Sequence, residues 1–192
     1  MPNIRGATVE HAALQMILEE HRALRALLAA FLEQGAAAPP DFPTLRAILF
    51  YLDEFPEHHH HRQESELLFP RLRARSRLLA DLLDQLDIDH AEGQQKLHRL
   101  GDALLAYEVL GAPRRAAFEQ AARDYVELYE AHMAVEERLV LPLADKVLLA
   151  EDWAVLDAAF RAHRDPLSGA DSAPDYRDLF ARLQSLLPAG SF

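Results

Sequence analysis

Two stretches of the sequence repeat one pattern of histidine, glutamate and proline. Residues 60–70 read HHRQESELLFP and residues 132–142 read HMAVEERLVLP, so both follow His-x-x-x-Glu-x-x-Leu-x-x-Pro. In a helix, residues four apart lie on one face one turn apart, so each stretch presents an imidazole beside a carboxylate. This ligand set suits iron, manganese or zinc. The residues that predict metal chemistry in these stretches are His60, Glu64, His132 and Glu136.

Two further histidines interrupt apolar stripes elsewhere in the chain. His21 lies in the stripe that contains Leu24, and His90 lies in the stripe that contains Leu86. Burying four imidazoles and two carboxylates without partners would cost several kcal/mol per charged group, and a bound cation removes that cost. The chain therefore resembles two copies of one helical hairpin, which together supply four histidines and two glutamates to one core.

Four long helices are needed to position these residues. Apolar spacing, prolines and glycines predict helices over 8–34, 42–75, 78–109 and 114–148, followed by short helices near 151–163 and 175–187. Pro56 predicts a kink in the second helix, or two helices in series. Long helices with short loops are typical of an up-down-up-down bundle. We expect an all-α fold, with a four-helix bundle over 1–148 and a C-terminal helical extension over 149–192 packed on it.

Composition narrows the possible functions. The 192-residue chain carries a formal net charge of −11, which disfavours binding to nucleic acid or to an anionic membrane. It has no cysteine, which excludes disulfides and thiolate metal sites. No long uncharged apolar run predicts a membrane span, and the N-terminus lacks the pattern of a signal peptide. We therefore predict a cytoplasmic protein; whether it forms a homodimer stays open.

The combined motifs resemble the hemerythrin-like (HHE cation-binding) family. The resemblance covers about residues 10–148, and it includes DHAEG at 89–93 as well as the two repeated stretches. It implies a four-helix bundle around a non-haem di-iron centre with an oxo or hydroxo bridge, for which manganese or zinc could substitute. It also implies binding or handling of dioxygen, nitric oxide or peroxide. Carried over by position, the metal ligands are His21, His60, Glu64, His90, His132 and Glu136.

The chain departs from the oxygen-carrying members of this family in two helices. Those members have a second histidine one turn after the one that matches His90, where this chain has Gln94. They also carry His-x-x-x-x-Asp in the fourth helix, where this chain has His-x-x-x-Glu. Extra open metal positions favour oxidation or turnover over reversible oxygen carriage. His61 could supply the missing nitrogen if the second helix is kinked.

Several polar neighbours of these residues are expected to be solvated. We expect this of two histidines and five acidic residues, although an acidic partner for His21 or His90 is an alternative. The residues concerned are His58, His59, Glu20, Glu57, Glu66, Asp89 and Glu137.

Four functions fit the sequence. The leading one is a di-iron protein that binds, senses or scavenges dioxygen, nitric oxide or peroxide. An enzyme on the same scaffold, with peroxidase-like, oxidase-like or nitric-oxide-reducing activity, is the main alternative, and a metal-free interaction bundle is the third. A ferritin-type carboxylate centre fits less well. Glu57 and His60 match its Glu-x-x-His pattern, but the fourth helix has Tyr129 where the second copy needs glutamate.

Overall fold

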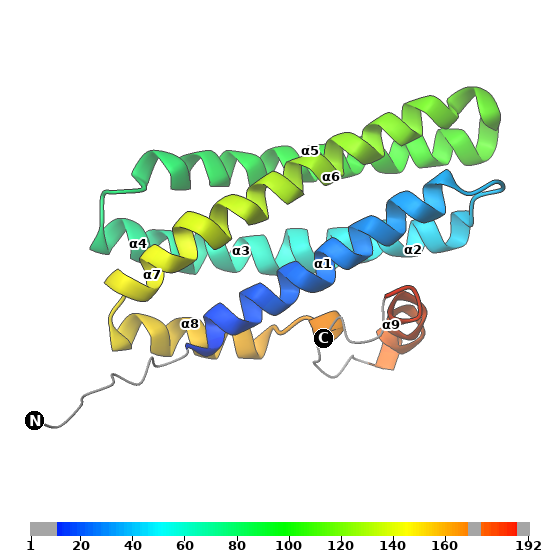
Figure 1. Cartoon of the computed structure of the whole chain (residues 1–192). Coiled ribbons are helices and arrows are strands. Elements are labelled where there is room, and N and C mark those ends of the chain that lie inside the picture. The colour runs from blue at the N-terminus through cyan, green and yellow to red at the C-terminus, as the bar shows by residue number, and fades with distance from the viewer. Residues whose placement is uncertain (1–10, 169–173, 188–192) are drawn as a thin grey trace, which may run out of the picture.

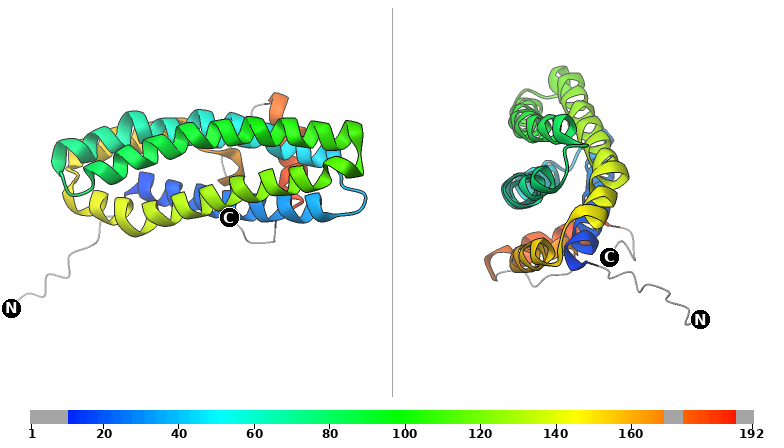
Figure 2. Two further views of the ribbon diagram at one scale, coloured as in Figure 1. Left: turned by 90° about the horizontal axis from the view of Figure 1, so that it is seen from above. Right: turned by 90° about the vertical axis from the view of Figure 1, so that its left-hand side faces the viewer.

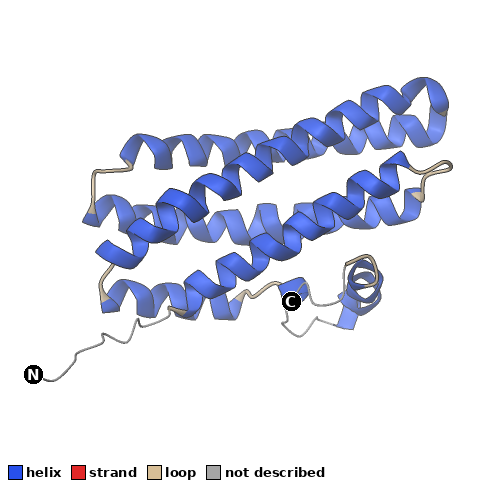
Figure 3. Ribbon diagram, in the orientation of Figure 1, coloured by secondary structure: helices blue, strands red, loops and turns tan. Residues whose placement is uncertain are grey.

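The computed structural model describes residues 11–168 and 174–187 of the chain (Figure 1). Within these residues all regular structure is helical, which confirms the all-α prediction (Figure 3). The predicted helix start at residue 8 lies outside the described residues. None of the described helices is both long and apolar enough to cross a membrane.

Four long helical stretches lie side by side, and the chain turns back at each of the three connections between them (Figures 1 and 2). The first and third are the single helices α1 (Ala12–Ala36) and α5 (Ala80–Leu110). The second runs through α2 (Phe42–Leu52), α3 (His61–Gln63) and α4 (Phe69–Arg75). The fourth runs through α6 (Arg115–Val135) and α7 (Leu141–Val147).

Wider π-helical turns join the segments of the second and fourth stretches. They span Asp53–His60, Glu64–Leu68 and Glu136–Val140. Pro56 lies inside the first turn, and Pro70 and Pro142 each lie two residues beyond the end of one of the other two. Because proline lacks an N–H and its ring clashes with the carbonyl four residues earlier, a regular α-helical turn is disfavoured there. The His61 N–H instead donates to the Pro56 carbonyl, five residues back. The stretch thus remains helical past Pro56 and shifts the phase of the side chains that follow.

The apolar core forms two clusters, one toward each end of the long helices. One contains Leu27 of α1 and Leu100 of α5, whereas the other contains Ile17 of α1 and Leu86 of α5. On both helices a histidine lies between the two apolar sets, at position 21 or 90. Polar residues therefore form a buried layer between two apolar clusters.

The C-terminal extension packs against the same core. Helix α8 (Ala150–Ala162) lies along α1 and buries Trp153 and Phe160 in the second cluster. Helix α9 (Arg177–Gln184) contacts α2 and buries Phe180 in the first cluster. Helix α8 has the length predicted for 151–163 and is shifted by one residue, whereas α9 is shorter than the predicted 175–187 helix. A 3-10 turn at Pro166–Ser168 follows α8.

Candidate metal centre

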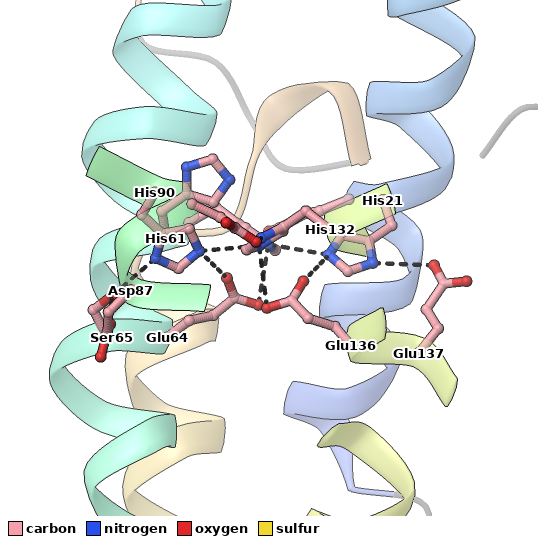
Figure 4. A network of polar contacts seen from close by, with 12 residues as sticks. His21, His61, Glu64, Ser65, Asp87, His90, His132, Glu136 and Glu137 are labelled. Carbon is pink, nitrogen blue, oxygen red and sulfur yellow. Dashed lines mark hydrogen bonds and ion pairs between the residues drawn. The ribbon is translucent and has the colours of Figure 1, made fainter. Parts of the chain in front are cut away.

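The structure brings all six predicted residues into one buried cluster (Figure 4). Each is at most 9 % exposed. One donor atom from each of His21, His60, Glu64 and Glu136 lies within 4.8 Å of the others, and the same holds for Glu64, His90, His132 and Glu136. The two groups share both glutamates. Two four-residue groups with a common pair of carboxylates are an arrangement that could hold two cations side by side.

His61 joins this cluster as a fifth histidine. One of its ring nitrogens lies within 4.8 Å of donor atoms of His90 and His132, and its ring stacks on that of His90 with centroids 4.4 Å apart. Its neighbour His60 belongs to the other group of the same cluster. In a regular helix, consecutive residues point about 100° apart, so two neighbours would not both be expected to face the centre. The wide turn over Asp53–His60 explains why both do, because it changes the phase of the helix just before both histidines.

The inward-facing imidazole nitrogens of the cluster pair with one another, and its carboxylate oxygens lack hydrogen-bonding partners within the described part of the chain. The Nε2 atoms of His21 and His60 lie 3.2 Å apart, and those of His90 and His132 lie 3.0 Å apart. The carboxylate oxygens of Glu64 and Glu136 lie 3.3–3.5 Å from imidazole nitrogens, yet none accepts a hydrogen bond from the described residues. Buried, unsatisfied carboxylates are costly. Paired nitrogens and unsatisfied carboxylate oxygens within two adjacent groups are the donors that two cations would satisfy.

Four of the five outward nitrogens, by contrast, have polar partners within 3.3 Å. His60 Nδ1 lies 2.6 Å from Glu20, and His21 Nδ1 lies 3.0 Å from Glu137. His61 Nδ1 lies 3.3 Å from Glu57, and His90 Nδ1 lies 2.9 Å from Ser65. His132 Nδ1 lies 3.8 Å from the Asp89 carboxylate, too far for a hydrogen bond, and has no hydrogen-bonding partner among the described residues. Such partners fix the ring orientation and direct Nε2 toward the centre.

The expectation that Glu20 and Glu57 are solvated is therefore wrong. Glu20 is 7 % exposed and the Glu57 side chain is 3 % exposed. Glu20 faces His60 across the bundle, and Glu57 faces His61 one turn along its own helical stretch. These partners offset the free-energy cost of burying the two carboxylates. The sequence held a signal only for Glu57, which lies four residues before its partner His61, whereas the partner of Glu20 is His60 on another helix.

A sequence comparison agrees with this geometry. The family model of the hemerythrin HHE cation-binding domain matches residues 12–144, which include every residue of the cluster. The chain belongs to this family. It is also 25% identical over 141 residues to uncharacterized proteins of Mycobacterium tuberculosis and Mycobacterium bovis. Those matches cover 71% of this chain and 55% of each relative, so the chain spans about half the length of the curated relatives it matches. No solved structure matches it significantly.

Charges inside the HHE domain are strongly coupled. Burial alone would lower the pKa of His132, but Glu136 and Asp89 raise this pKa to about 10. Burial and Glu136 would raise the pKa of Glu64, but His60 and His90 lower it to about 2. The pKa of His61 instead falls well below its ordinary value, because the ring is buried and lies near His90. Metal binding must therefore compete with the proton that His132 holds firmly, whereas burial favours the neutral form of His61.

The two sides of the HHE centre differ in their access to solvent. A pocket of about 260 Å³ reaches the cluster beside His61 and His90, and its other lining residues include Glu57, Asp87 and Gln94. Gln94 itself is exposed. This pocket gives a small polar molecule a path to the cluster.

The opposite side holds a cavity of only about 10 Å³, lined by His21, His60, Glu20, Tyr51 and Asp165. Asp165 comes from the C-terminal extension and accepts a hydrogen bond from the Tyr51 hydroxyl. Burial, together with the charge of Glu20, raises the pKa of Asp165 to about 7, although the bond from Tyr51 opposes this shift. The extension thus closes the side of the centre that lies opposite the pocket.

The remaining histidines of the four-histidine run lie away from the cluster. The His58 side chain is 50 % exposed, as expected, and its Nδ1 lies 2.5 Å from the Asp53 carbonyl oxygen. His59 is only partly exposed and stacks on His163 with ring centroids 5.9 Å apart. The run therefore supplies its last two members to the centre.

Proposed function

We propose that this chain is a non-haem di-iron protein that binds, senses or scavenges dioxygen, nitric oxide or peroxide. We further propose that its four long helical stretches form the up-down-up-down bundle of the family and that it works in the cytoplasm, without a nucleic-acid or membrane partner. The observation that carries the proposal is the pair of buried donor groups that share Glu64 and Glu136.

The donor set fits two cations. Glu64 and Glu136 would be shared between them, His21 and His60 would complete one position, and three histidines would complete the other. Those three are His61, His90 and His132. The unsatisfied oxygens of both glutamates and the facing Nε2 pairs support this assignment, because a cation would satisfy all of them at once. These donors suit iron, and manganese or zinc would fit the same set.

The bound iron pair would supply a redox-active binding site for a small diatomic molecule or peroxide. The protein's own residues would do the rest. The partners of the outward nitrogens hold the imidazoles in place, and the pocket beside His61 and His90 admits the ligand. The apolar clusters above and below exclude bulk water from the buried layer.

A di-iron enzyme is the alternative function. Peroxidase-like, oxidase-like or nitric-oxide-reducing turnover needs a path for substrate and product, and the pocket of about 260 Å³ offers one. Steady consumption of peroxide or nitric oxide with a reductant present would favour this alternative. Stoichiometric binding without turnover would favour the leading proposal.

Elemental analysis of the freshly purified protein, with absorption spectra before and after reduction, tests the proposal. We expect about two metal ions per chain, mainly iron, and charge-transfer bands in air that disappear on reduction. His132→Ala should lose metal and lower the melting temperature, because metal binding stabilises the folded state. His58→Ala, which changes an exposed histidine, is the matched control and should change neither. Equal behaviour of the two variants, or a wild type that melts unchanged after chelation, would contradict the proposal and favour a metal-free bundle.

A further inference from the structure

Glu57 is a buried carboxylate held by three groups at the edge of the candidate centre. One of its oxygens accepts hydrogen bonds from the hydroxyls of Tyr129 at 2.5 Å and Tyr125 at 3.2 Å. Its other oxygen faces Nδ1 of His61 at 3.3 Å. The two tyrosines come from α6, whereas Glu57 and His61 belong to the second helical stretch. The carboxylate thus connects two helices through a single histidine of the centre.

Helix α5 leaves space for this arrangement at Gly93. A Cβ atom added there would lie 1.9 Å from the Tyr129 hydroxyl oxygen and 2.6 Å from the ring carbon that bears it. Glycine inside a helix is unfavourable by roughly 0.5–1 kcal/mol relative to alanine, so its place in the middle of α5 needs a reason. The close approach of Tyr129 supplies one. The ring of Tyr129 also lies parallel to that of His61, with centroids 5.1 Å apart.

We propose that Glu57, clamped by Tyr125 and Tyr129, is the positioning residue that holds His61 as the fifth histidine of the centre, in place of the nitrogen ligand that α5 lacks at Gln94. The inference rests on the proposed function. A histidine that binds a metal through one ring nitrogen carries its proton on the other, and a carboxylate that accepts this proton fixes the tautomer and the ring direction. Because two hydroxyls hold the opposite oxygen of Glu57, the carboxylate cannot swing away from His61.

The same contacts distinguish His61 from the histidine it stacks upon. Nδ1 of His90 faces the hydroxyl of Ser65, which is neutral and in turn donates to Asp87 at 2.6 Å. Nδ1 of His61 faces a carboxylate directly. The orientation of the His61 ring therefore depends directly on a charged group, Glu57, whereas that of His90 depends on a neutral hydroxyl.

Iron-57 Mössbauer spectroscopy of the iron-loaded full chain tests the proposal, together with the rate at which a chelator removes each iron. We expect two distinct iron signals in the wild type, since one position has two histidines and the other has three. Glu57→Gln keeps the size of the side chain but removes its charge. It should change the signal of one iron only, and that iron should leave about 10- to 100-fold faster. Tyr129→Phe should act in the same direction with a smaller effect.

Glu66→Gln is the matched control, because Glu66 lies on the same helical stretch, is 59 % exposed and pairs with Arg62 at the surface. It should leave both signals unchanged. Wild-type signals and rates in both Glu57→Gln and Tyr129→Phe would overturn the proposal and leave the di-iron function intact. Equal changes at both irons would show a general loosening of the fold and would also overturn it. A wild type without a two-iron spectrum would overturn the proposed function itself, and this inference with it.

Discussion

The two copies of the repeated motif, at residues 60–70 and 132–142, have the same His and Glu residues facing the centre. One helical turn before these histidines the two copies differ. His132 follows His60 by 72 residues, and Glu136 follows Glu64 by the same number. At this offset Glu57 corresponds to Tyr129, and these two residues hydrogen bond to each other in the structure. The repeat thus builds a symmetric shared core, and its mismatched positions form a contact that only unlike residues can make.

The same offset sets His61 against Met133, which is 1 % exposed and packs in the first apolar cluster. Both copies have a wide turn that begins at the glutamate, but only the first has one before its histidines, around Pro56. The additional turn is what brings His61 inward. The difference between the copies teaches that a local change in helix geometry, rather than the repeated motif, makes the two sides of the centre unequal.

The largest effect should come from the symmetric part. If Glu64 and Glu136 are each shared by both metal positions, Glu64→Ala and Glu136→Ala should each lose both metal ions, since either change leaves every position short of a ligand. Elemental analysis after dialysis measures this. Retention of one ion by either variant would show that the carboxylates are not shared.

The next largest effect concerns the room that α5 gives to Tyr129. Gly93→Ala should lower the free energy of unfolding by about 2–4 kcal/mol, because the added methyl group would overlap the Tyr129 hydroxyl and force the ring away. Urea denaturation measures the change. Gly101→Ala, on the same helix with nothing within 4 Å of the new methyl group, should instead be neutral or stabilising by up to about 1 kcal/mol. Similar losses in both variants would contradict the steric account.

His61→Met makes the first copy resemble the second. Each metal position would then have two histidines, so we expect the two iron signals to become more alike and the affinity of one ion to fall about 10- to 100-fold. Competition with a chelator measures the affinity. Adding Gln94→His should restore part of the loss, because Gln94 lines the same pocket as His61 and His90. Unchanged binding in His61→Met would show that His61 is not a ligand.

The smallest effect concerns the extension that covers the first copy. The pKa of Asp165 is raised to about 7 by burial, against about 3.9 in an unfolded chain. Between pH 4 and pH 7 the folded state therefore binds more protons at this group than the unfolded state, and its contribution to stability falls as the pH rises.

Asp165→Asn should remove this dependence. In chelator-treated protein it should be about 1–2 kcal/mol more stable than the wild type at pH 8, and the advantage should vanish near pH 4. Urea denaturation at the two pH values measures it. Asp175→Asn, an exposed change in the same extension, is the control. An advantage for Asp165→Asn that is independent of pH would contradict the burial of an ionisable Asp165.

The sequence predicted the helices well because their apolar stripes are long and regular. The predicted 78–109 helix is observed as Ala80–Leu110, and the six residues placed on these stripes meet in one layer. The inward turn of His61 was predicted only on the condition of a kink in the second helix, since periodicity assumes regular α-helix and Pro56 indicated only that the helix changes there. The burial of Glu20 and Glu57 escaped prediction. Their partners lie on other helices or across a wide turn, which an analysis of one helix at a time does not detect.

Asp165 lies beyond residue 144, where the match to the family ends, yet it forms part of the wall beside His60. A protein shortened to the matched region would retain every candidate ligand but would lose that wall, and water would reach the centre from both flanks. The stretch of chain that shields the centre is therefore longer than the stretch that matches the family. Any partner that displaces the extension would alter the surroundings of the centre without contacting a candidate ligand.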